Sequence, residues 1–578
     1  MQYTDKKISR GKRIYFAEDL DITKLEIVKE QFEQLLSEKI DSAEALIDLM
    51  KKSGELHDIL DEETAWRYIN MTRFADNEKY SRDFNDFYSG IILKTNEYDF
   101  KFARKIYESP FRKALGPDFD LLNRIVSNEI ELYRKENTPL QGQEMQLVSK
   151  YDAMFSQLTV KYDGKEQTLS QLQSYLENPD KNVRKDAWTL RSERLFTEKE
   201  RFNRLFDNLK EIRIQQAKNC DFDNYRDYMH QVKGRFSYTP QDLMEFHKAV
   251  ETEVLPLLRE LNEQRRQKLG IEALRPWDMQ VQTDGIALKP FKDADELLDK
   301  SIDILHKIRP EFGIRLNMMK NSGLLDLENR KGKAPGGYNY PLLETGAPFI
   351  FMNAVGIHSD VVTLMHESGH AMHTFAMKDI RLDPYKNTPS EVAELSSMSM
   401  ELITMDKWTR FYPDEKAFKK AKRKQLYRTI SLLPWCMIVD AFQHWIYTSP
   451  NHTTEQREAF FSSLIDRFNT GIDWNGLQDH KNNLWQFQLH IFKVPFYYIE
   501  YAMSQLGALA IYRNYKRFGK EKTLRDYENF LSLGYTRPVS ELYGAAGIEF
   551  DFSAGYIKGL IDFVREELNE INGDLDKI

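Results

Sequence analysis

The chain has 578 residues, of which 41% are hydrophobic and 30% are charged, with a net charge of −8. This balance is ordinary for a soluble globular protein, and the length predicts two or more sub-domains, because one hydrophobic core rarely serves so long a chain. Lysine and arginine are spread along the chain. That distribution argues against nucleic acid as a partner, since such binding needs a concentrated basic face.

Cysteine usage and the first residues predict the compartment. Cys220 and Cys436 are the two cysteines, and neither lies at a spacing that gives a thiolate zinc site or a disulfide framework. Residues 1–7 carry mainly polar and charged side chains and lack the apolar core of a signal peptide. No uncharged apolar stretch reaches the 18 or more residues of a membrane span. We therefore expect a cytoplasmic protein that does not span a membrane.

Helical periodicity dominates the chain. Residues 25–36 carry apolar side chains at every third or fourth position, and 181–217 form a longer, charged helical pattern. We divide the chain at about residue 190, into a helical N-terminal region, 1–190, and a second helical region, 191–578, that carries the chemical motifs. The best strand candidate is 347–353, which follows a basic, glycine-bearing loop at 330–338.

The stretch 361–377 contains no proline and predicts a helix, with Ser359 or Asp360 as its cap. It carries the sequence His366-Glu367-Ser368-Gly369-His370 among apolar neighbours.

The two histidines of this helix predict a metal site. His366 and His370 are one turn apart on one face, so both imidazoles can reach a single ion. Zinc suits two neutral imidazoles and a carboxylate, with a fourth position left for water. Glu367 lies one position round the helix and can act as the base for that water. We expect one zinc ion per chain.

The third ligand must come from outside this helix. A metzincin continuation would need glycine at 373 and histidine at 376, and the chain has His373 and Ala376. We interpret His373 as a packed histidine; His358, two turns before His366, is open to either interpretation.

The next predicted helix supplies two candidate carboxylates. Thr388 and Glu391 have the spacing of a capping box, with Pro389 at the first helical position. In such a box the Glu391 side chain would accept a backbone N–H at the start of the helix and would not be free to bind a metal. Glu394 lies one turn deeper among apolar residues, where an unpaired carboxylate is costly. Glu394 is our third ligand, with Glu391 as a supporting residue or the alternative.

An aromatic block follows at 490–502. Hydrolysis of a peptide passes through an oxyanion that needs a hydrogen-bond donor, and tyrosine or histidine can provide one. His490 is one candidate. Tyr498 and Tyr501 lie three apart on one helical face, whereas Tyr497 is expected to point elsewhere. By itself, a stripe of aromatic residues at helical spacing more often belongs to the hydrophobic core than to a functional site.

Together these motifs resemble the oligoendopeptidase F and thimet oligopeptidase family of zinc peptidases, nearest to its bacterial oligoendopeptidase F and PZ-peptidase branch. The matching features, in family order, are the motif 366–370, the sequence Val-Ala-Glu-Leu-Ser-Ser at 392–397, and the block from 490 to 501. The glycine loop, the strand candidate and the segment 539–543 fit as well.

The resemblance implies His366, His370 and Glu394 as zinc ligands and Glu367 as general base. It also implies that His490 and a tyrosine, Tyr498 or Tyr501 with Tyr497 as the alternative, stabilise the oxyanion or hold the substrate.

The fold implied is mainly α, a closed multi-helical ellipsoid with a deep channel and a small β-sheet near the metal. Its substrates would be short peptides in extended conformation. The strand 349–353 would be either an edge strand that pairs with such a peptide or an ordinary buried strand.

The expected function is a zinc metalloendopeptidase that cuts internal bonds of short peptides. The alternative is a zinc exopeptidase of the dipeptidyl carboxypeptidase or carboxypeptidase type, which needs a fixed basic group for the terminal carboxylate. Arg330, Lys331, Lys333 and Arg537 are the candidates for that group. A third possibility is a peptide-binding protein without catalysis, which would have no need of Glu367.

Overall fold

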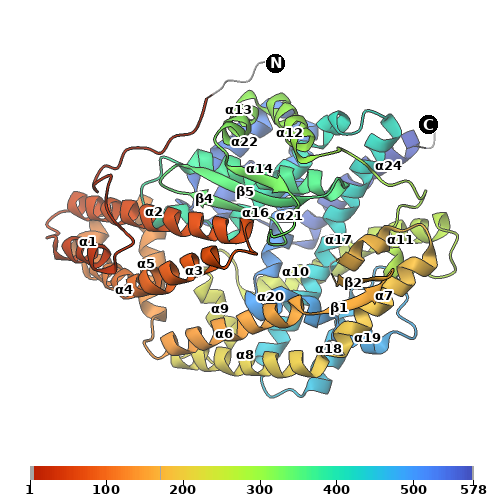
Figure 1. Ribbon diagram of the computed structural model, residues 1–578, viewed down its shortest axis with the longest axis horizontal. Helices are drawn as coiled ribbons and strands as arrows, with labels where there is room; N and C mark the ends of the chain where they lie inside the picture. The colour runs from red at the N-terminus through yellow and green to blue at the C-terminus, as the bar shows by residue number, and fades with distance from the viewer. Residues whose placement is uncertain (1–5, 170, 576–578) are drawn as a thin grey trace.

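The computed structural model describes residues 6–169 and 171–575. It is a mainly helical ellipsoid with two small sheets, which confirms the predicted fold class (Figure 1). Within these residues we find no helix that is both long and apolar enough to cross a membrane.

Six helices form the N-terminal part, at the red and orange end of Figure 1. They are α1 (Leu25–Ser37), α2 (Ala43–Arg73), α3 (Glu78–Phe87), α4 (Leu93–Glu108), α5 (Asp120–Leu132) and α6 (Asn137–Ser156). The helix predicted at 25–36 is confirmed, and its buried residues Val28, Phe32 and Leu35 share one face. Helices α1, α2, α4 and α5 share a core of their own, which also takes in Leu382 and Tyr385 from a later segment.

Seven helices follow: α7 (Lys181–Phe196), α8 (Lys199–Asn219), α9 (Tyr225–Val232), α10 (Pro240–Glu253), α11 (Leu255–Lys268), α12 (Ala294–Ile308) and α13 (Pro310–Asn321). The pattern at 181–217 thus forms two helices instead of one. The break follows Phe196, where the Thr197 hydroxyl donates to the Arg194 carbonyl at 2.7 Å and Glu198 leaves the helical conformation. Such a local side-chain bond competes with the helical ladder.

The sheet near the centre has three strands, β3 (Leu325–Glu328), β4 (Tyr338–Leu342) and β5 (Ala347–Ala354), in the order β3-β5-β4. The strand predicted at 347–353 is therefore present. It is the central strand, parallel to β3 and antiparallel to β4, so the edge-strand interpretation of 349–353 is wrong. Its run of buried apolar residues is typical of a strand that is covered on both faces. The edges of the sheet are β3 and β4. A separate hairpin joins β1 (Thr159–Tyr162) and β2 (Lys165–Thr168).

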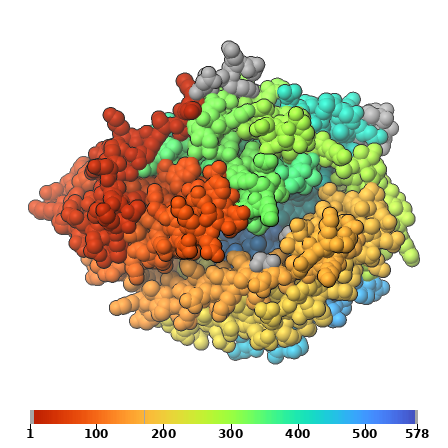
Figure 2. Space-filling view, in the orientation of Figure 1, coloured from red at the N-terminus to blue at the C-terminus, as the bar shows by residue number. Residues whose placement is uncertain are grey.

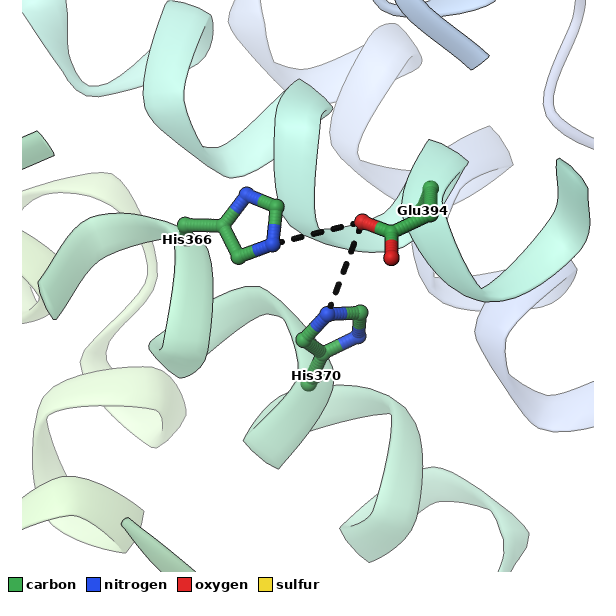
Figure 3. Close-up of side chains that lie close together, drawn as sticks. All are labelled: His366, His370 and Glu394. Carbon is green, nitrogen blue, oxygen red and sulfur yellow. Dashed lines mark ion pairs between the residues drawn. The ribbon is translucent and has the colours of Figure 1, made fainter. Parts of the chain in front are cut away.

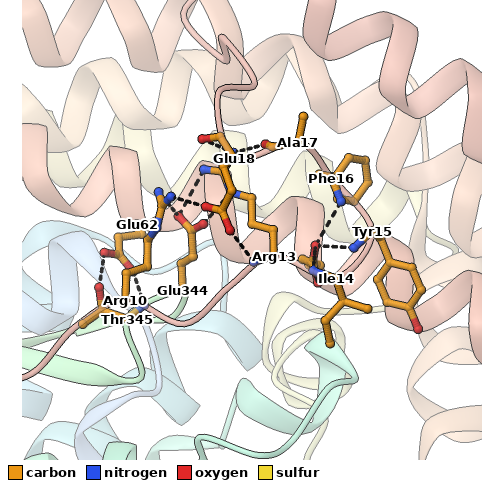
Figure 4. A network of polar contacts seen from close by, with 11 residues as sticks. Arg10, Arg13, Ile14, Tyr15, Phe16, Ala17, Glu18, Glu62, Glu344 and Thr345 are labelled. Carbon is orange, nitrogen blue, oxygen red and sulfur yellow. Dashed lines mark hydrogen bonds and ion pairs between the residues drawn. The ribbon is translucent and has the colours of Figure 1, made fainter.

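A polar network fastens the N-terminal segment to α2 and to the β4–β5 turn (Figure 4). The Glu55 carboxylate of α2 accepts the backbone N–H groups of Ile14, Tyr15 and Phe16. In the turn, Glu344 pairs with Arg13 at 2.5 Å, and the Thr345 N–H donates to Glu62 of α2 at 2.6 Å. The network therefore joins the N-terminal helices to the sheet.

The remaining helices are α14 (His358–Met377), α15 (Asp383–Lys386), α16 (Ser390–Ile403), α17 (Glu415–Thr448), α18 (Thr454–Arg467), α19 (Gln478–Asn483), α20 (Leu489–Lys493), α21 (Tyr498–Phe518), α22 (Lys520–Leu533), α23 (Val539–Ala545) and α24 (Ala554–Leu575). Helices α14, α16, α17 and α21 pack on one another within the main core. Figure 2 shows a hollow between the N-terminal helices, the sheet region and the segment around residues 160–200, with atoms of the C-terminal part visible at its floor.

Candidate metal centre

Helix α14, which carries His366 and His370 and is called the metal helix below, crosses helix α16 at very short range. A Cβ atom at Gly369 of α14 would lie 2.5 Å from the Ser397 Cα of α16 and 2.6 Å from the Ser396 carbonyl oxygen. Only glycine fits there, because real Cβ atoms do not approach backbone so closely. The glycine inside the 366–370 motif therefore permits the crossing that brings α16 beside the two histidines.

At this crossing the structure brings together His366, His370 and Glu394 (Figure 3), with one ligand atom from each lying within 4.8 Å of the others. The Glu394 Oε2 atom is 3.3 Å from the His366 Nε2 atom and 3.7 Å from the His370 Nε2 atom. Two ligand atoms at zinc-bond length from one tetrahedral ion are about 3.3 Å apart. The His366–Glu394 separation matches this spacing and the His370–Glu394 separation is somewhat longer, so the three side chains can hold one ion after small side-chain shifts.

Burial and charge set the protonation of this cluster. Burial lowers the pKa of His370 to about 4, so that imidazole is neutral, as a metal ligand must be. Burial raises the pKa of Glu394, but its hydrogen bond to His366 outweighs this effect, and the pKa falls to about 2. The Glu394 carboxylate is therefore ionised throughout the physiological range.

Glu367 lies beside the cluster on α14, and only 7% of its surface is exposed. Burial raises the pKa of this carboxyl to about 7 against the lowering effect of His366. A pKa near the working pH suits a group that takes and returns a proton.

Glu401 of α16 is a functional candidate that the sequence analysis missed. Its Oε1 atom lies 2.7 Å from His366 Nδ1, and its Oε2 accepts a hydrogen bond from Gln425 of α17, also at 2.7 Å. A carboxylate in this position fixes the ring and tautomer of a metal-binding histidine. The signal was in the sequence, since Glu401 lies two helical turns after Glu394 on the same face.

Glu401→Gln is expected to weaken zinc binding by about 10- to 100-fold, the usual effect of losing such a partner. The amide lacks the negative charge with which the Glu401 carboxylate raises the basicity of the His366 ring as a ligand. Competition with a chromophoric zinc chelator measures the affinity, and unchanged affinity would show that Glu401 has no part in orienting His366.

The predicted caps of both helices are wrong. Helix α14 begins at His358, so Ser359 and Asp360 lie inside it, and the Asp360 carboxylate accepts the N–H groups of the preceding loop. Helix α16 has Pro389 as its N-cap and no side-chain cap. Proline has no polar side chain to accept a hydrogen bond from the first turn, so the capping box predicted for Thr388 and Glu391 does not form.

Glu391 consequently has a different role from the one expected. It is buried in the core, and the hydroxyl of Tyr238 donates to its Oε1 at 3.4 Å. Burial raises the pKa of its carboxyl to about 7. The structure thus places Glu391 outside the cluster that contains Glu394.

The other two histidines of α14 are buried outside the cluster. The His373 ring packs against Phe530 with 5.8 Å between ring centroids. The His358 Nδ1 atom lies 2.7 Å from the Tyr412 hydroxyl.

A turn at Phe496, which has a φ of +62°, divides the aromatic block. It lies between the end of α20 at Lys493 and the start of α21 at Tyr498. His490 is in edge contact with Tyr498 at 4.8 Å between ring centroids. The expectation that Tyr497 points elsewhere is wrong, because its hydroxyl lies 3.2 Å from Glu394 Oε1. Tyr501 packs against both neighbouring tyrosines, at 5.2 Å from Tyr497 and 5.4 Å from Tyr498.

Three of the basic residues considered for a terminal carboxylate have other partners. Arg330 and Lys333 pair with Asp326 at 2.6 and 2.8 Å. Arg537 pairs with Asp118 at 3.0 Å. Lys331 is exposed on the loop before β4.

Comparisons with known proteins point to one family of peptidases. The model of peptidase family M3 matches residues 174–561, and that of the peptidase M3 N-terminal domain matches residues 19–121. An oligoendopeptidase F homolog of Borreliella burgdorferi is 24% identical over 95% of this chain and 94% of its own. The group B oligopeptidase PepB of Streptococcus agalactiae is 21% identical over 85% and 82%. A structure of PZ peptidase A with an inhibitor superposes with a TM-score of 0.88 at 27% identity, covering 96% of this chain and 98% of that one.

Proposed function

Because the chain belongs to peptidase family M3 and is a metallo-oligopeptidase, we propose that it is a zinc endopeptidase that cuts internal bonds of short peptides. His366, His370 and Glu394 hold the ion in this proposal. A zinc ion held there would polarise the scissile carbonyl and make a water molecule more acidic. The spacing of the three ligand atoms, which fits a tetrahedral ion, is the observation that carries the proposal.

Glu367 is the general base. Its buried carboxylate takes a proton from the attacking water and passes it to the leaving amine. A pKa of about 7 supports both halves of this exchange, since the group is easily deprotonated and easily reprotonated.

The aromatic block supplies hydrogen-bond donors for the oxyanion. Burial lowers the pKa of His490 to about 4, so this ring acts as a neutral donor or acceptor. The negative charge of Glu394 acts on Tyr497 and Tyr501, in addition to burial, and helps to raise the pKa of both hydroxyls. For Tyr498 the causes are burial and the nearby Cys436 and Tyr501. In this proposal Tyr497, whose hydroxyl contacts Glu394, and Tyr501, which packs against Tyr497, serve the ligand cluster, and Tyr498 supports the His490 ring.

Replacing Tyr498 and Tyr501 one at a time by phenylalanine separates these roles. Tyr501→Phe is expected to lower kcat by about 10- to 100-fold with little change in KM, because one oxyanion donor is lost. Tyr498→Phe should have a smaller effect. Steady-state kinetics on one quenched peptide measure both, and a larger loss in Tyr498→Phe would assign the donor to Tyr498.

The hollow of Figure 2 supports peptides of limited size as substrates, since it lies between the N-terminal helices and the second region of the chain. In this proposal residues 1–190 and 191–578 enclose it together. Strand β4 is an edge of the sheet, and the Asn339 side chain of β4 donates to the Glu367 carbonyl at 3.1 Å. An extended peptide can pair with this edge beside the metal helix.

A peptide blocked at both ends, with a fluorophore and a quencher on either side of the bond, tests endopeptidase action. Cleavage that is abolished by a chelator and restored by zinc is the expected result. Cleavage only of peptides with a free C-terminus would instead establish the exopeptidase alternative.

A further inference from the structure

A cavity of about 1690 Å³ lies between the β1–β2 hairpin region and α17. Its lining reaches Asn353 at the end of β5 and His358 at the first turn of α14. The cavity therefore opens beside the end of β5 and the start of the metal helix, α14.

One wall of this cavity is basic. Helix α17 contributes Lys416, Lys420, Arg423, Lys424 and Arg428, whose spacing of three and four places them along one side of the helix. The whole chain carries a net charge of −8, so this concentration of positive charge runs against its overall balance.

The acidic residues of the lining only partly neutralise this wall. Lys420 pairs with Asp284 at 2.7 Å and Lys424 with Glu177 at 3.4 Å. Arg428 and Lys416 are exposed and form no ion pair within the described part of the chain. Positive charge is thus left over for a bound anion.

The basic wall is connected to the candidate metal centre through two buried side chains. Gln425, the residue after Lys424, donates to Glu401, and Glu401 contacts His366. His358 precedes His366 by eight residues on the same helix, a rise of about 12 Å. That separation equals about four residues of an extended peptide.

His358 adds an unused polar atom at the same place. Only 4% of its surface is exposed, and its Nε2 atom has no hydrogen-bond partner among the described residues. An unpartnered buried nitrogen is costly, so a polar partner would stabilise it, and His358 belongs to the lining of the cavity.

We propose that this cavity binds carboxylates of the substrate, so that the enzyme prefers peptides with acidic residues a few positions to one side of the scissile bond. The inference rests on the proposed endopeptidase function. The carboxylate can belong to an Asp or Glu side chain or to the C-terminus of the peptide, and the chemistry of recognition is the same.

Pairs of quenched peptides, blocked at both ends and differing only by Glu or Gln at one position, test the preference. At one or more positions on a single side, kcat/KM is expected to be about fivefold higher for the Glu peptide, the effect of one partly exposed ion pair. The difference should shrink as salt is added, because salt screens such pairs. A further pair, with a free or an amidated C-terminus, distinguishes the terminal carboxylate from side chains.

The double variant Lys424→Gln with Arg428→Gln should cut both peptides of a pair at the rate of the wild type on the Gln peptide. Lys419→Gln is the matched control, since Lys419 lies on the same helix, pairs with Glu415, and is not among the residues named in the cavity lining. Its Glu preference should equal that of the wild type. Thermal unfolding checks that each variant is folded.

Equal cleavage within every pair overturns the inference and leaves the endopeptidase function standing, as does a preference that persists in the double variant. If no blocked peptide is cleaved, the proposed function fails instead. Fluorescence anisotropy of the same Glu and Gln peptides then tests the cavity by itself, and equal affinity overturns the inference.

Discussion

Glu367→Gln is expected to abolish nearly all peptide hydrolysis, with kcat lower by about 1000-fold, within the range for loss of a general base. The amide has the size of the carboxyl, so it fits the buried position, but it cannot accept a proton from water. Zinc content should remain at one ion per chain, because Glu367 is not in the ligand cluster. Quenched-peptide kinetics and metal analysis on the same sample measure the two properties.

Glu391→Gln is the matched control for this experiment. It makes the same change at another buried glutamate, on α16 and outside the ligand cluster. This variant should keep most of its activity. Substantial turnover by metal-replete Glu367→Gln would refute the role of Glu367 as base.

Glu394→Gln is expected to lose zinc affinity by more than the 100-fold that marks loss of a supporting residue. A neutral amide is a poor ligand for zinc, and two imidazoles alone leave the site incomplete. The change also alters the contact with the Tyr497 hydroxyl, which lies 3.2 Å from the Glu394 carboxylate. Zinc titration against a chelator and metal analysis after dialysis measure the loss.

The comparison with Glu391→Gln is again decisive, since the two glutamates are one turn apart on the same helix. Near-normal zinc affinity is expected for Glu391→Gln. The reverse order, with zinc lost from Glu391→Gln and kept by Glu394→Gln, would transfer the ligand to Glu391.

Helix content and the pairing of His366 with His370 followed from the sequence because both depend on local geometry. A helix places residues four apart on one face wherever it lies in a fold. The helix at 25–36 and the strand at 347–353 were predicted for the same reason, since periodicity and β-propensity act within a few residues.

The structure brings Glu394 beside the two histidines, although part of the argument for choosing this residue was wrong. A buried carboxylate does need a partner, and Glu394 has His366 and His370 beside it. The capping box that was to occupy Glu391 does not form. Glu391 is instead held within the core by Tyr238, a contact across 153 positions that no local pattern contains.

What the sequence by itself determined is the metal helix, with His366, Glu367 and His370 in fixed relative positions. The tertiary structure decided which carboxylates reach it: Gly369 allows α16 to cross, so Glu394 and Glu401 both meet the His366 ring. It also turned Tyr497 toward Glu394 and made 347–354 the central strand of its sheet. These outcomes depend on how distant segments pack, and packing is set by shape and burial rather than by spacing along the chain.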